Sequence, residues 1–393
     1  MPDRDAQPPR VRIGLVSDHL FPFAHGGAER VYRVLADAIA AEGAELSYYT
    51  RTQWEPGTPL KTEFAVESVW SGSVYDERGT RTIGAALRWS SALLRTLWRA
   101  ELDVLIVSAT PVFNVFVGML ARIRRPRMVL VVDWLEIWPW KKWRSYSGLL
   151  AGTIAWILQS MAVHIGSVRT VNSRTTLERL PKRAQATAIQ LPLVSMAGPP
   201  RATAHDIEPT GLLFVGRHIP DKNLPLLPEV MQALVSSFPK LTATVVGDGP
   251  DRAVAEARAS HCGVADRISF VGRVSDEALE RLLASSSLLF FPSVREGFGL
   301  VVCEAARFGT PSVVVDHPDN AAAALITEGQ NGARAASADV TELAAATERV
   351  LAAGTPLREQ TQQWYEQSWA QGGFETVARQ LIALALPKRS TAR

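Results

Sequence analysis

The segment LLFFPSVREGFGLVVCEAARFGTPSVVVD, residues 288–316, contains the pattern from which the fold can be predicted. LLFFPS at its start and PSVVVD at its end both read as short buried strands. Between them, GLVVCEAARFG predicts a helix that ends at Gly309, with Pro311 beyond it. Two strands joined by a helix form a β-α-β unit, in which the strands are parallel.

The same alternation extends over most of the chain. In the first half, VRIGLVS, AELSYYT, LDVLIVS and RMVLVVD read as strands, with helices from Gly27 and near 84–100. In the second half, GLLFVGR, LTATVVGDG and RISFVGR repeat the pattern, with helices from Asn223 and near 251–260. Such alternation predicts an α/β fold with parallel sheets.

The length predicts two domains, because 393 residues exceed the roughly 250–300 at which a single core stops growing. Near the centre the chain becomes rich in Pro, Ala and Thr and loses its period, as in a linker. The predicted parts are a disordered tail over 1–10, an N-terminal domain over 11–192, a linker over 193–209, a C-terminal domain over 210–355, and C-terminal helices over 356–393, broken at Gly372–Gly373, that pack on the first domain.

Composition excludes several classes of protein. Hydrophobic residues make up 47% and charged residues 21% of the chain, which are ordinary values for a folded globular protein. A net charge of +3 against 42 Lys and Arg is too balanced for a general nucleic-acid binder, so no nucleic-acid partner is expected. Cys262 and Cys303 make no disulfide framework, and residues 1–10 lack the apolar segment of a secretory signal, so a cytoplasmic location is predicted.

Two carboxylates enclose an uncharged stretch in REGFGLVVCE. Glu296 falls in the loop after a predicted strand, where open α/β sheets bind ligands. Gly297 and Gly299 let the backbone bend and present its N–H groups to a ligand. Glu304 lies about one turn into the helix among apolar neighbours, where a carboxylate is costly without partners. Ribose hydroxyls would be suitable partners, and an i,i+3 pair with Arg307 is the alternative.

Two further loops follow predicted strands. In FVGRHIPDKN, Arg217 and Lys222 supply two cations, which could stabilise a diphosphate whose negative charge grows as it leaves. The alternative is that the two side chains are simply solvated on a surface loop. In VVGDGPDR, Gly247 and Gly249 permit close approach of the backbone to a ligand, although such a turn is common. The dinucleotide fingerprint G-x-G-x-x-G is absent, because Arg252 occupies the place of its last glycine.

Taken together, these elements resemble the retaining glycosyltransferases of group 1 (family 4), which include sucrose synthases, glycogen synthase relatives and bacterial mannosyltransferases. The matching elements are Gly216 and Arg217 with Lys222, the GDGP turn, and two glutamates with seven residues between them, including GFGL. The loop and helix FPFAHGGAERVYRVLADAIA, residues 21–40, also resemble the start of that family. The resemblance spans nearly the whole chain and implies two facing Rossmann-like domains, the GT-B arrangement, with an interdomain cleft.

The resemblance implies a role for each matched residue. Arg217 and Lys222 would bind the diphosphate of a UDP- or GDP-hexose, and Glu304 its ribose hydroxyls. Glu296 would contact the donor sugar, and no cofactor other than this co-substrate is expected. The remaining donor-binding residues implied are Gly26, Gly27, Gly216, Gly247, Gly249, Phe298, Gly299 and Leu300.

One position departs from the family. Relatives often carry a histidine at the end of the fourth strand of the first domain, where this chain reads VLVVDWLEIW. Asp133 occupies about that place and is a candidate to take over the sugar contact, with His25 as an alternative. The only D-x-D, Asp3–Asp5, lies in the polar tail, and no metal is expected because the two cations and helix N-termini would compensate the diphosphate.

The first half also suggests the acceptor. Basic residues interleaved with tryptophans, followed by the apolar segment 148–166, are typical of surfaces that bind lipid headgroups. Gln159, Ser160 and His164 argue against a membrane span there. We therefore expect that this region contacts an anionic membrane surface peripherally and that the acceptor is a glycan or a lipid-linked molecule. The alternative is that the segment 148–166 is a core helix of the first domain and that the tryptophans fill the wall of the cleft. The residues concerned are Arg122, Arg124, Arg125, Arg127, Lys141, Lys142, Arg144, Trp134, Trp138, Trp140 and Trp143.

The predicted activity is that of a hexosyltransferase. The acceptor hydroxyl would attack the anomeric carbon while the diphosphate leaves, stabilised by Arg217 and Lys222. Retention of configuration is implied by the resemblance. A sugar-nucleotide epimerase or a phosphorylase on the same architecture is an alternative, although no lysine site for the pyridoxal phosphate of a phosphorylase is apparent. A non-catalytic nucleotide-sugar-binding subunit is another, motivated by Asp133 in place of histidine.

Overall fold

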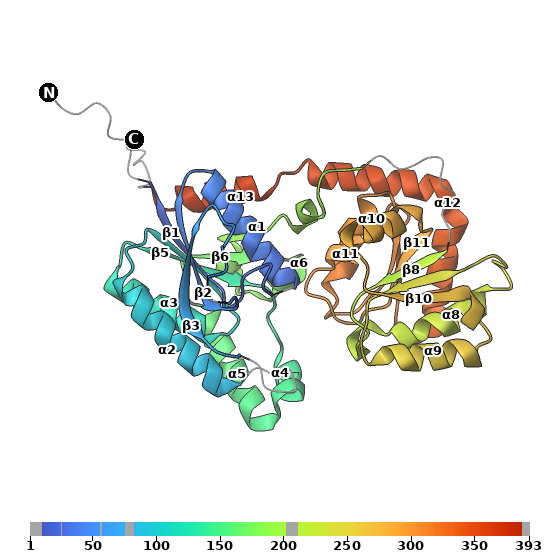
Figure 1. The fold of residues 1–393 in the computed structure, drawn as a ribbon, viewed down its shortest axis with the longest axis horizontal. Coiled ribbons are helices and arrows are strands. Elements are labelled where there is room, and N and C mark those ends of the chain that lie inside the picture. The colour runs from blue at the N-terminus through green and yellow to red at the C-terminus, as the bar shows by residue number, and fades with distance from the viewer. Residues whose placement is uncertain (1–9, 25, 56, 75–81, 202–210, 387–393) are drawn as a thin grey trace. The chain divides into compact units, whose positions relative to one another are not determined.

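The structure is a computed structural model that describes residues 10–24, 26–55, 57–74, 82–201 and 211–386. Contacts divide the chain into two compact units, Met1–Pro192 with Gly373–Arg393, and Leu193–Gly372. Each unit is built on a parallel sheet with helices against it (Figure 1). The predicted fold class, α/β with two Rossmann-like domains, is confirmed.

The sheet of the first unit has the strand order β3-β2-β1-β4-β5-β6-β7, and every neighbouring pair is parallel. The direction of winding reverses between β1 and β4. Right-handed crossovers therefore place α2, α3 and α5 on one face of the sheet and α1 on the other, where α13 packs against α1 (Figure 1). The elements are β1 (Arg12–Val16), α1 (Gly27–Ala41), β2 (Glu45–Thr52), β3 (Ala65–Ser71), α2 (Ile83–Arg99), β4 (Val104–Ser108), α3 (Phe113–Arg124), β5 (Val129–Trp134), α4 (Trp140–Ser147), α5 (Leu149–Ala162), β6 (Val168–Val171), α6 (Arg174–Arg179), α7 (Lys182–Gln185), β7 (Ala188–Gln190) and α13 (Phe374–Ala383).

The sheet of the second unit has the order β10-β9-β8-β11-β12-β13, again with parallel neighbours only. Its winding reverses between β8 and β11, which is where open α/β sheets bind ligands beyond the carboxyl ends of the strands. The elements are η1 (Leu193–Ala197), β8 (Leu212–Val215), η2 (Pro220–Lys222), η3 (Leu224–Leu226), α8 (Leu227–Leu234), β9 (Ala243–Val246), α9 (Asp251–His261), η4 (Ala265–Arg267), β10 (Ile268–Gly272), α10 (Asp276–Ser285), β11 (Leu288–Phe291), α11 (Leu300–Ala306), β12 (Ser312–Val315), η5 (Ala321–Leu325), β13 (Gly332–Ala335) and α12 (Val340–Trp369).

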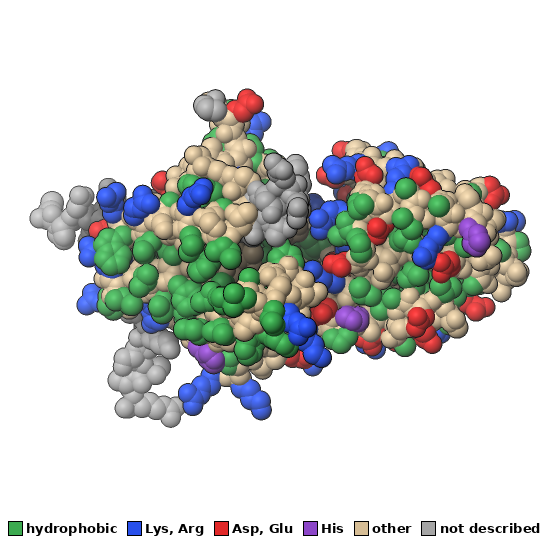
Figure 2. Space-filling view, turned by 90° about the horizontal axis from the view of Figure 1, so that it is seen from below, with side chains coloured by type: hydrophobic (Ala, Val, Ile, Leu, Met, Phe, Trp, Pro, Cys, Tyr) green, Lys and Arg blue, Asp and Glu red, His purple; other side chains and the backbone are tan. Residues whose placement is uncertain are grey.

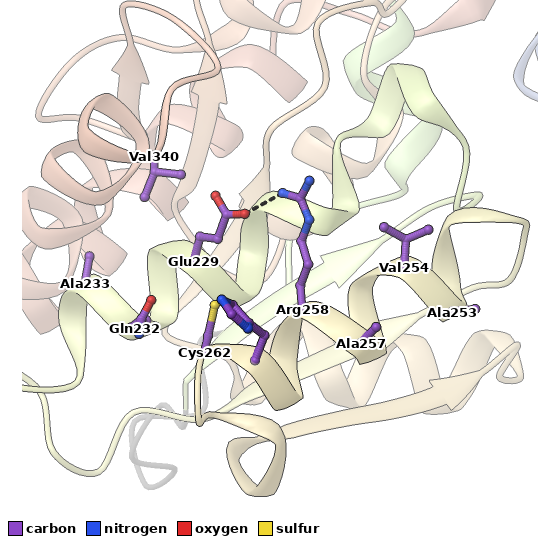
Figure 3. A pocket seen from close by; sticks show the side chains of 10 residues that line it. Glu229, Gln232, Ala233, Ala253, Val254, Ala257, Arg258, Cys262 and Val340 are labelled. Carbon is purple, nitrogen blue, oxygen red and sulfur yellow. Dashed lines mark hydrogen bonds and ion pairs between the residues drawn. The ribbon is translucent and has the colours of Figure 1, made fainter.

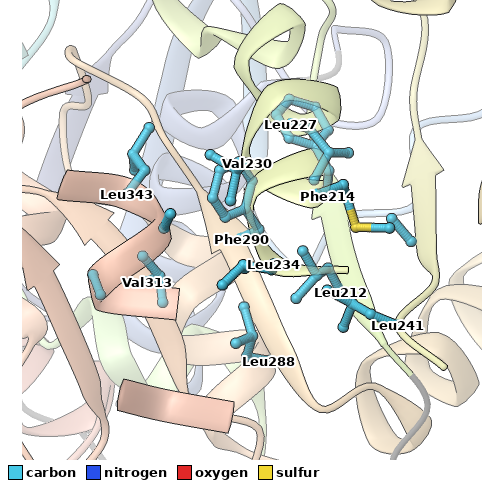
Figure 4. Packing of buried hydrophobic residues seen from close by; sticks show 14 of the residues in the cluster. Leu212, Phe214, Leu227, Val230, Leu234, Leu241, Leu288, Phe290, Val313 and Leu343 are labelled. Carbon is cyan, nitrogen blue, oxygen red and sulfur yellow. The ribbon is translucent and has the colours of Figure 1, made fainter. Parts of the chain in front are cut away.

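Apolar side chains fasten the second sheet to its helices. Phe214 of β8 and Phe290 of β11 are buried against Leu227 and Val230 of α8 (Figure 4). On the other face, a second cluster joins Phe291 to the helix α11. Because the strands are clamped on both faces, the loops at their carboxyl ends start from fixed positions.

Residues 193–201 are docked on the second unit, whereas the sequence predicted a linker over 193–209. Leu193 in η1 is buried, and the Tyr365 hydroxyl donates a hydrogen bond to the carbonyl of Gly198 at 2.5 Å. The short 3-10 helix lacks the period of an α-helix, which is why the pattern suggested a linker. The rest of that prediction, 202–210, and the predicted tail over residues 1–9 lie outside the described residues.

The C-terminal helices divide between the units. The chain breaks at Gly372–Gly373 as predicted, and α13 packs on α1 of the first unit. α12 instead stays with the second unit, where the buried guanidinium of Arg358 donates to the carbonyl oxygens of Ser286 and Ala284 at 2.6 and 2.9 Å. Of the segment 356–393, which was predicted to pack on the first domain, α13 lies in the first unit, whereas the end of α12 lies in the second unit, where Arg358 finds its carbonyl partners. Residues 387–393 lie outside the described residues.

Candidate active site

The predicted donor-binding residues of the second half meet at one edge of its sheet. Gly216 and Arg217 directly follow β8, Gly247 follows β9, and Glu296 lies in the loop after β11. Because β9, β8 and β11 are adjacent and parallel, their carboxyl ends lie side by side. The structure thus brings together the loops that the sequence analysis treated separately.

Lys222 and Glu296 form an ion pair between two of these loops. The ammonium of Lys222 donates to Glu296 Oε1, and the two side chains are only 16% and 14% exposed. The Lys222 ammonium also lies 5.0 Å from the centre of the Phe291 ring. Removing one member of such a pair leaves the other charge poorly solvated, so each fixes the position of its partner. Arg217, in the same loop as Lys222, is exposed.

The glycines of the GDGP turn allow two loops to interlock. Gly247 has φ 120°, and a Cβ there would overlap the carbonyl oxygen of Gly216. Gly249 has φ 150°, and its Cβ would lie 2.5 Å from the carbonyl oxygen of His218. L side chains rarely adopt these conformations. The glycines therefore let the loop after β9 support the loop that carries Arg217.

His218 is a residue of this loop that the sequence analysis did not single out. Its side chain is fully buried, and among the described residues neither ring nitrogen has a hydrogen-bond partner. Burial lowers the pKa of His218, because desolvation disfavours the charged ring. Its ring lies 5.9 Å from that of Phe214 in β8. A lone histidine in FVGRHIP gave no signal that it would be internal.

The loop that carries Glu296 is held from the next strand. Glu296 N donates to Asp319 O and Ala321 N donates to Glu296 O, both at 3.0 Å. Buried Asn320 donates its side-chain amide to Ser293 O at 3.0 Å. Asn320 was not predicted as a site residue, although the turn residues HPDN directly after a predicted strand were a signal.

The middle of REGFGLVVCE turns sharply into α11. Gly299 has φ 99°, and a Cβ there would lie 2.5 Å from Cβ of Ala322. Phe298 before it is buried and Leu300 after it is the first residue of α11. Only glycine fits this close approach, so the GFGL sequence fixes where the helix begins.

Glu304 lies one turn into α11 and is half-buried. Arg307, the alternative partner considered from the sequence, donates to Glu280 at 2.9 Å and to Pro199 O at 2.8 Å. Its guanidinium is thus anchored by groups outside α11. The α11 helix itself continues from the loop that holds Glu296, which places both glutamates on one short segment of the second unit.

In the first unit, Asp133 is completely buried at the end of β5. The Tyr32 hydroxyl of α1 donates to its Oδ2 at 2.6 Å, and Thr170 Oγ1 donates to its Oδ1 at 2.5 Å. Burial raises the pKa of Asp133 to about 6, although the two hydrogen bonds act in the opposite direction. Asp133 was predicted as a candidate for sugar contact; in the structure both of its carboxylate oxygens accept hydrogen bonds from side chains of the first unit.

Replacing Asp133 by asparagine should change how stability depends on pH. The folded pKa of about 6 exceeds the ordinary value near 4, so between these values the native state holds a proton that the unfolded chain has lost. Wild-type stability therefore loses on the order of 3 kcal/mol as pH rises through this window. From pH 4 to pH 7, the thermal unfolding midpoint of the wild type should fall relative to that of Asp133→Asn. The control variant Glu45→Gln, at an exposed position, should keep the wild-type dependence on pH. A constant gap between the midpoints of wild type and Asp133→Asn would contradict the assigned pKa.

The Gly-Gly loop of the first unit precedes α1. Gly26 has an extended backbone with φ −160°, which other residues also adopt, and a Cβ there would meet the flexible carboxylate of Glu29. Gly27 is the first residue of α1. His25, the alternative catalytic histidine, lies outside the described residues.

A buried polar pair that the sequence analysis missed follows β1. His19 Nδ1 lies 2.9 Å from Asp18 Oδ1, and both side chains are nearly fully buried. They lie where the first sheet reverses its winding, at the carboxyl end of β1. The sequence VRIGLVSDH, a strand followed at once by polar residues, was the available signal.

Neither a metal site nor a second donor site is found among the described residues outside these loops. No group of three or more His, Cys, Asp or Glu side chains among them is arranged to hold a metal ion. An open groove of about 1220 Å³ lies between α8 and α9, where Glu229 and Arg258 are ion-paired at 2.5 Å (Figure 3). None of the predicted site residues lines this groove, so it is separate from the loops described above.

Comparison with known proteins agrees with this arrangement. Residues 200–368 match the model of the family described as glycosyl transferases group 1. The chain is 26% identical over 371 residues to glycogen synthase of Mycobacterium tuberculosis, a match that covers 87% of this chain and 86% of that protein.

Solved structures show the same fold. Sucrose-phosphate synthase from Thermosynechococcus elongatus superposes with a TM-score of 0.70 at 18% identity, covering 95% of this chain and 97% of that one. The Anabaena protein HepE in complex with UDP and glucose gives a TM-score of 0.66 at 18% identity, covering 95% and 98%. Identities this low establish likeness of fold alone.

The loops at the carboxyl edge of the second sheet and the family match define a glycosyltransferase. The match to the group 1 glycosyl transferases covers residues 200–368, which make up most of the second unit. The resemblance drawn from the sequence motifs, and the class of enzyme that it implied, are confirmed.

Proposed function

We propose that this glycosyltransferase moves a hexosyl group from a UDP- or GDP-hexose to an acceptor hydroxyl, with retention of configuration. The observation that carries the donor assignment is the Lys222–Glu296 pair, with Arg217 in the same loop as Lys222. This arrangement places cations that can bind a diphosphate next to a carboxylate that can accept hydrogen bonds from sugar hydroxyls. That HepE, of the same fold, binds UDP and glucose supports this choice of donor.

In the proposed reaction the acceptor oxygen bonds to the anomeric carbon as the bond from that carbon to the diphosphate breaks. The nucleoside diphosphate leaves with the bonding electrons, and the proton of the acceptor hydroxyl passes to an oxygen of the leaving diphosphate. Negative charge grows on the diphosphate in the transition state, so Arg217 and Lys222 stabilise that state more than the ground state. We propose that no metal ion or other cofactor takes part, since the two cations offset this charge.

Replacing Glu304 by alanine is the simplest test of the proposed donor site. If its carboxylate accepts the ribose hydroxyls, one of UDP, GDP and ADP should raise the unfolding temperature of the wild type, since a ligand at a hundred times its dissociation constant adds roughly 2.7 kcal/mol of stability. Glu304→Ala should lose most of this shift. The matched control is Glu348→Ala on α12, a glutamate of the same unit outside the proposed site, which should keep it. No shift with any nucleoside diphosphate, or a shift with NAD alone, would contradict the donor assignment.

We infer that the acceptor is a lipid-linked glycan or a cell-envelope glycolipid, and that the protein works in the cytoplasm at the inner face of the membrane. The support is the basic and apolar sequence from Arg122 to Met161 in the first domain, which would keep the enzyme near such an acceptor. A water-soluble glycan as the preferred acceptor, in assays that offer both, would contradict this part of the proposal.

A further inference from the structure

The helix α5 turns its apolar face outward. Leu150, Ile154, Ile157 and Met161 recur at helical spacing and are 77%, 50%, 46% and 56% exposed. The opposite side carries Gln159, which is only 5% exposed. No helix among the described residues is long and apolar enough to cross a bilayer. The arrangement inverts the usual one for a surface helix, in which the apolar stripe is buried.

The neighbouring helices extend this apolar surface. α2 and α3 lie on the same face of the first sheet as α5, and the exposed apolar residues of the three helices are here called the helical patch. Figure 2 shows apolar side chains gathered over the first unit, with Lys and Arg side chains at their border. The other members of the helical patch are Ile83, Leu87 and Trp98 of α2, Leu120 and Ile123 of α3, and Leu149 and Trp156 of α5.

The charged residues on the helices of this region are all basic. The sequences of α2, α3, α4 and α5 contain no Asp or Glu, although the chain as a whole has 39 acidic against 42 basic residues. Glu136, just before α4, pairs with Lys142 at 3.2 Å. The basic residues of the four helices are Arg88, Arg95, Arg99, Arg122, Arg124, Lys141, Lys142 and Arg144.

The tryptophans of this region hold α4 against α5. The amide of Trp138 and the indole of Trp143 donate to Gln159 Oε1 at 3.0 and 3.1 Å, and the Trp140 indole donates to Thr153 Oγ1 at 3.0 Å. From the sequence, these rings could either face lipid headgroups or pack within the first domain. Their hydrogen bonds explain why Gln159 is buried, and they fix the face of α5 that points outward.

We infer that the helical patch docks on the surface of an anionic lipid bilayer, with α5 lying in the plane of the interface. Apolar side chains would enter the boundary between headgroups and acyl chains, and the surrounding cations would contact anionic headgroups. An apolar surface on helices whose charged residues are all basic suits an anionic bilayer better than a neutral apolar partner. The delivery of a lipid-linked acceptor by this surface rests on the proposed function, whereas the docking itself does not.

Vesicle co-sedimentation of the full chain tests the inference. Wild type should pellet with vesicles of phosphatidylglycerol and phosphatidylcholine and much less with phosphatidylcholine alone, and salt should weaken the binding. Ile154→Glu with Ile157→Glu should lower binding at least tenfold. Both positions are about half exposed, so the variant should keep the wild-type thermal unfolding midpoint. The matched control, Val254→Glu with Val271→Glu in the second unit, replaces side chains 47% and 46% exposed and should bind as wild type does.

Three results would overturn the inference. One is equal vesicle binding by the wild type and the Ile154→Glu, Ile157→Glu variant. Another is equal binding to anionic and neutral vesicles. The third is a dimer in sedimentation velocity without lipid that this variant abolishes, because a second copy of the chain would then cover the patch. The increase in unfolding temperature that a nucleoside diphosphate causes, measured on the same samples, reports donor binding by the second unit. If vesicle binding is absent while this increase is unchanged, only the docking surface is contradicted, and the proposed donor site is not.

Discussion

Replacing Lys222 by alanine should lower kcat/KM for hexosyl transfer about 10²–10³-fold, a loss of about 3–4 kcal/mol of transition-state stabilisation. Lys222 is the cation that the structure fixes most firmly at the edge of the second sheet, through Glu296 and the ring of Phe291. Charge on the leaving diphosphate grows during the reaction, so the main effect should fall on kcat. Steady-state release of the nucleoside diphosphate measures it.

Two companion variants separate chemistry from folding. Lys222→Ala leaves the carboxylate of Glu296 without its cation, so its thermal unfolding midpoint must be measured as well. Arg217→Ala removes an exposed cation of the same loop and should lower kcat/KM without lowering that midpoint. Lys240→Ala, an exposed lysine of the second unit outside the site, should change neither quantity. Unchanged turnover in both Lys222→Ala and Arg217→Ala would contradict the assigned roles.

Replacing Gly247 by alanine should destabilise the second unit by about 2–4 kcal/mol and abolish donor binding at moderate donor concentration. A non-glycine residue at φ 120° costs about 1–3 kcal/mol, and a Cβ that overlaps the backbone of Gly216 costs a similar amount. The added Cβ would clash with backbone atoms of Gly216, so the clash can be removed only if the loop that carries Arg217 moves. Thermal unfolding and calorimetric titration with the nucleoside diphosphate found for wild type would measure the two effects.

Gly263→Ala is the matched control for this prediction. Gly263 also has a positive φ, 68°, but a Cβ there would meet nothing within 4 Å. It should therefore show only the strain of the backbone conformation, roughly 1–2 kcal/mol, with donor affinity retained. Equal loss of donor affinity in both variants would mean that general destabilisation, and not the interlocked loops, explains Gly247→Ala.

Much of the fold could be predicted because the buried parallel strands are continuous β-branched or aromatic runs. LDVLIVS, LLFFPS and PSVVVD became β4, β11 and β12. The edge strand β3 (Ala65–Ser71) was missed, because most of its residues are at least partly exposed and it carries no such run. The helix predicted from Asn223 begins at Leu227, since Asn223 adopts a left-handed φ of 50° between two short 3-10 turns.

The candidate site could be predicted where it depends on spacing along the chain and not where it depends on packing. The loops of Arg217, Gly247 and Glu296 each follow a strand, so chain order alone placed them at one edge. The contact of Lys222 with Glu296 joins residues 74 positions apart and required the structure. Likewise, no local pattern indicated that Asp133 would be enclosed by Tyr32.

The most direct test of the central claim is turnover of defined donors by the purified protein. Nucleoside diphosphate release from UDP-glucose, GDP-mannose and ADP-glucose should be measured with and without a membrane lipid extract as acceptor, for wild type and Lys222→Ala. We predict that wild type releases the nucleoside diphosphate from one donor, faster with acceptor, and that the variant loses about 10²–10³-fold of this rate. Binding of a nucleoside diphosphate with no release from any donor would contradict the assignment of hexosyl transfer to this site.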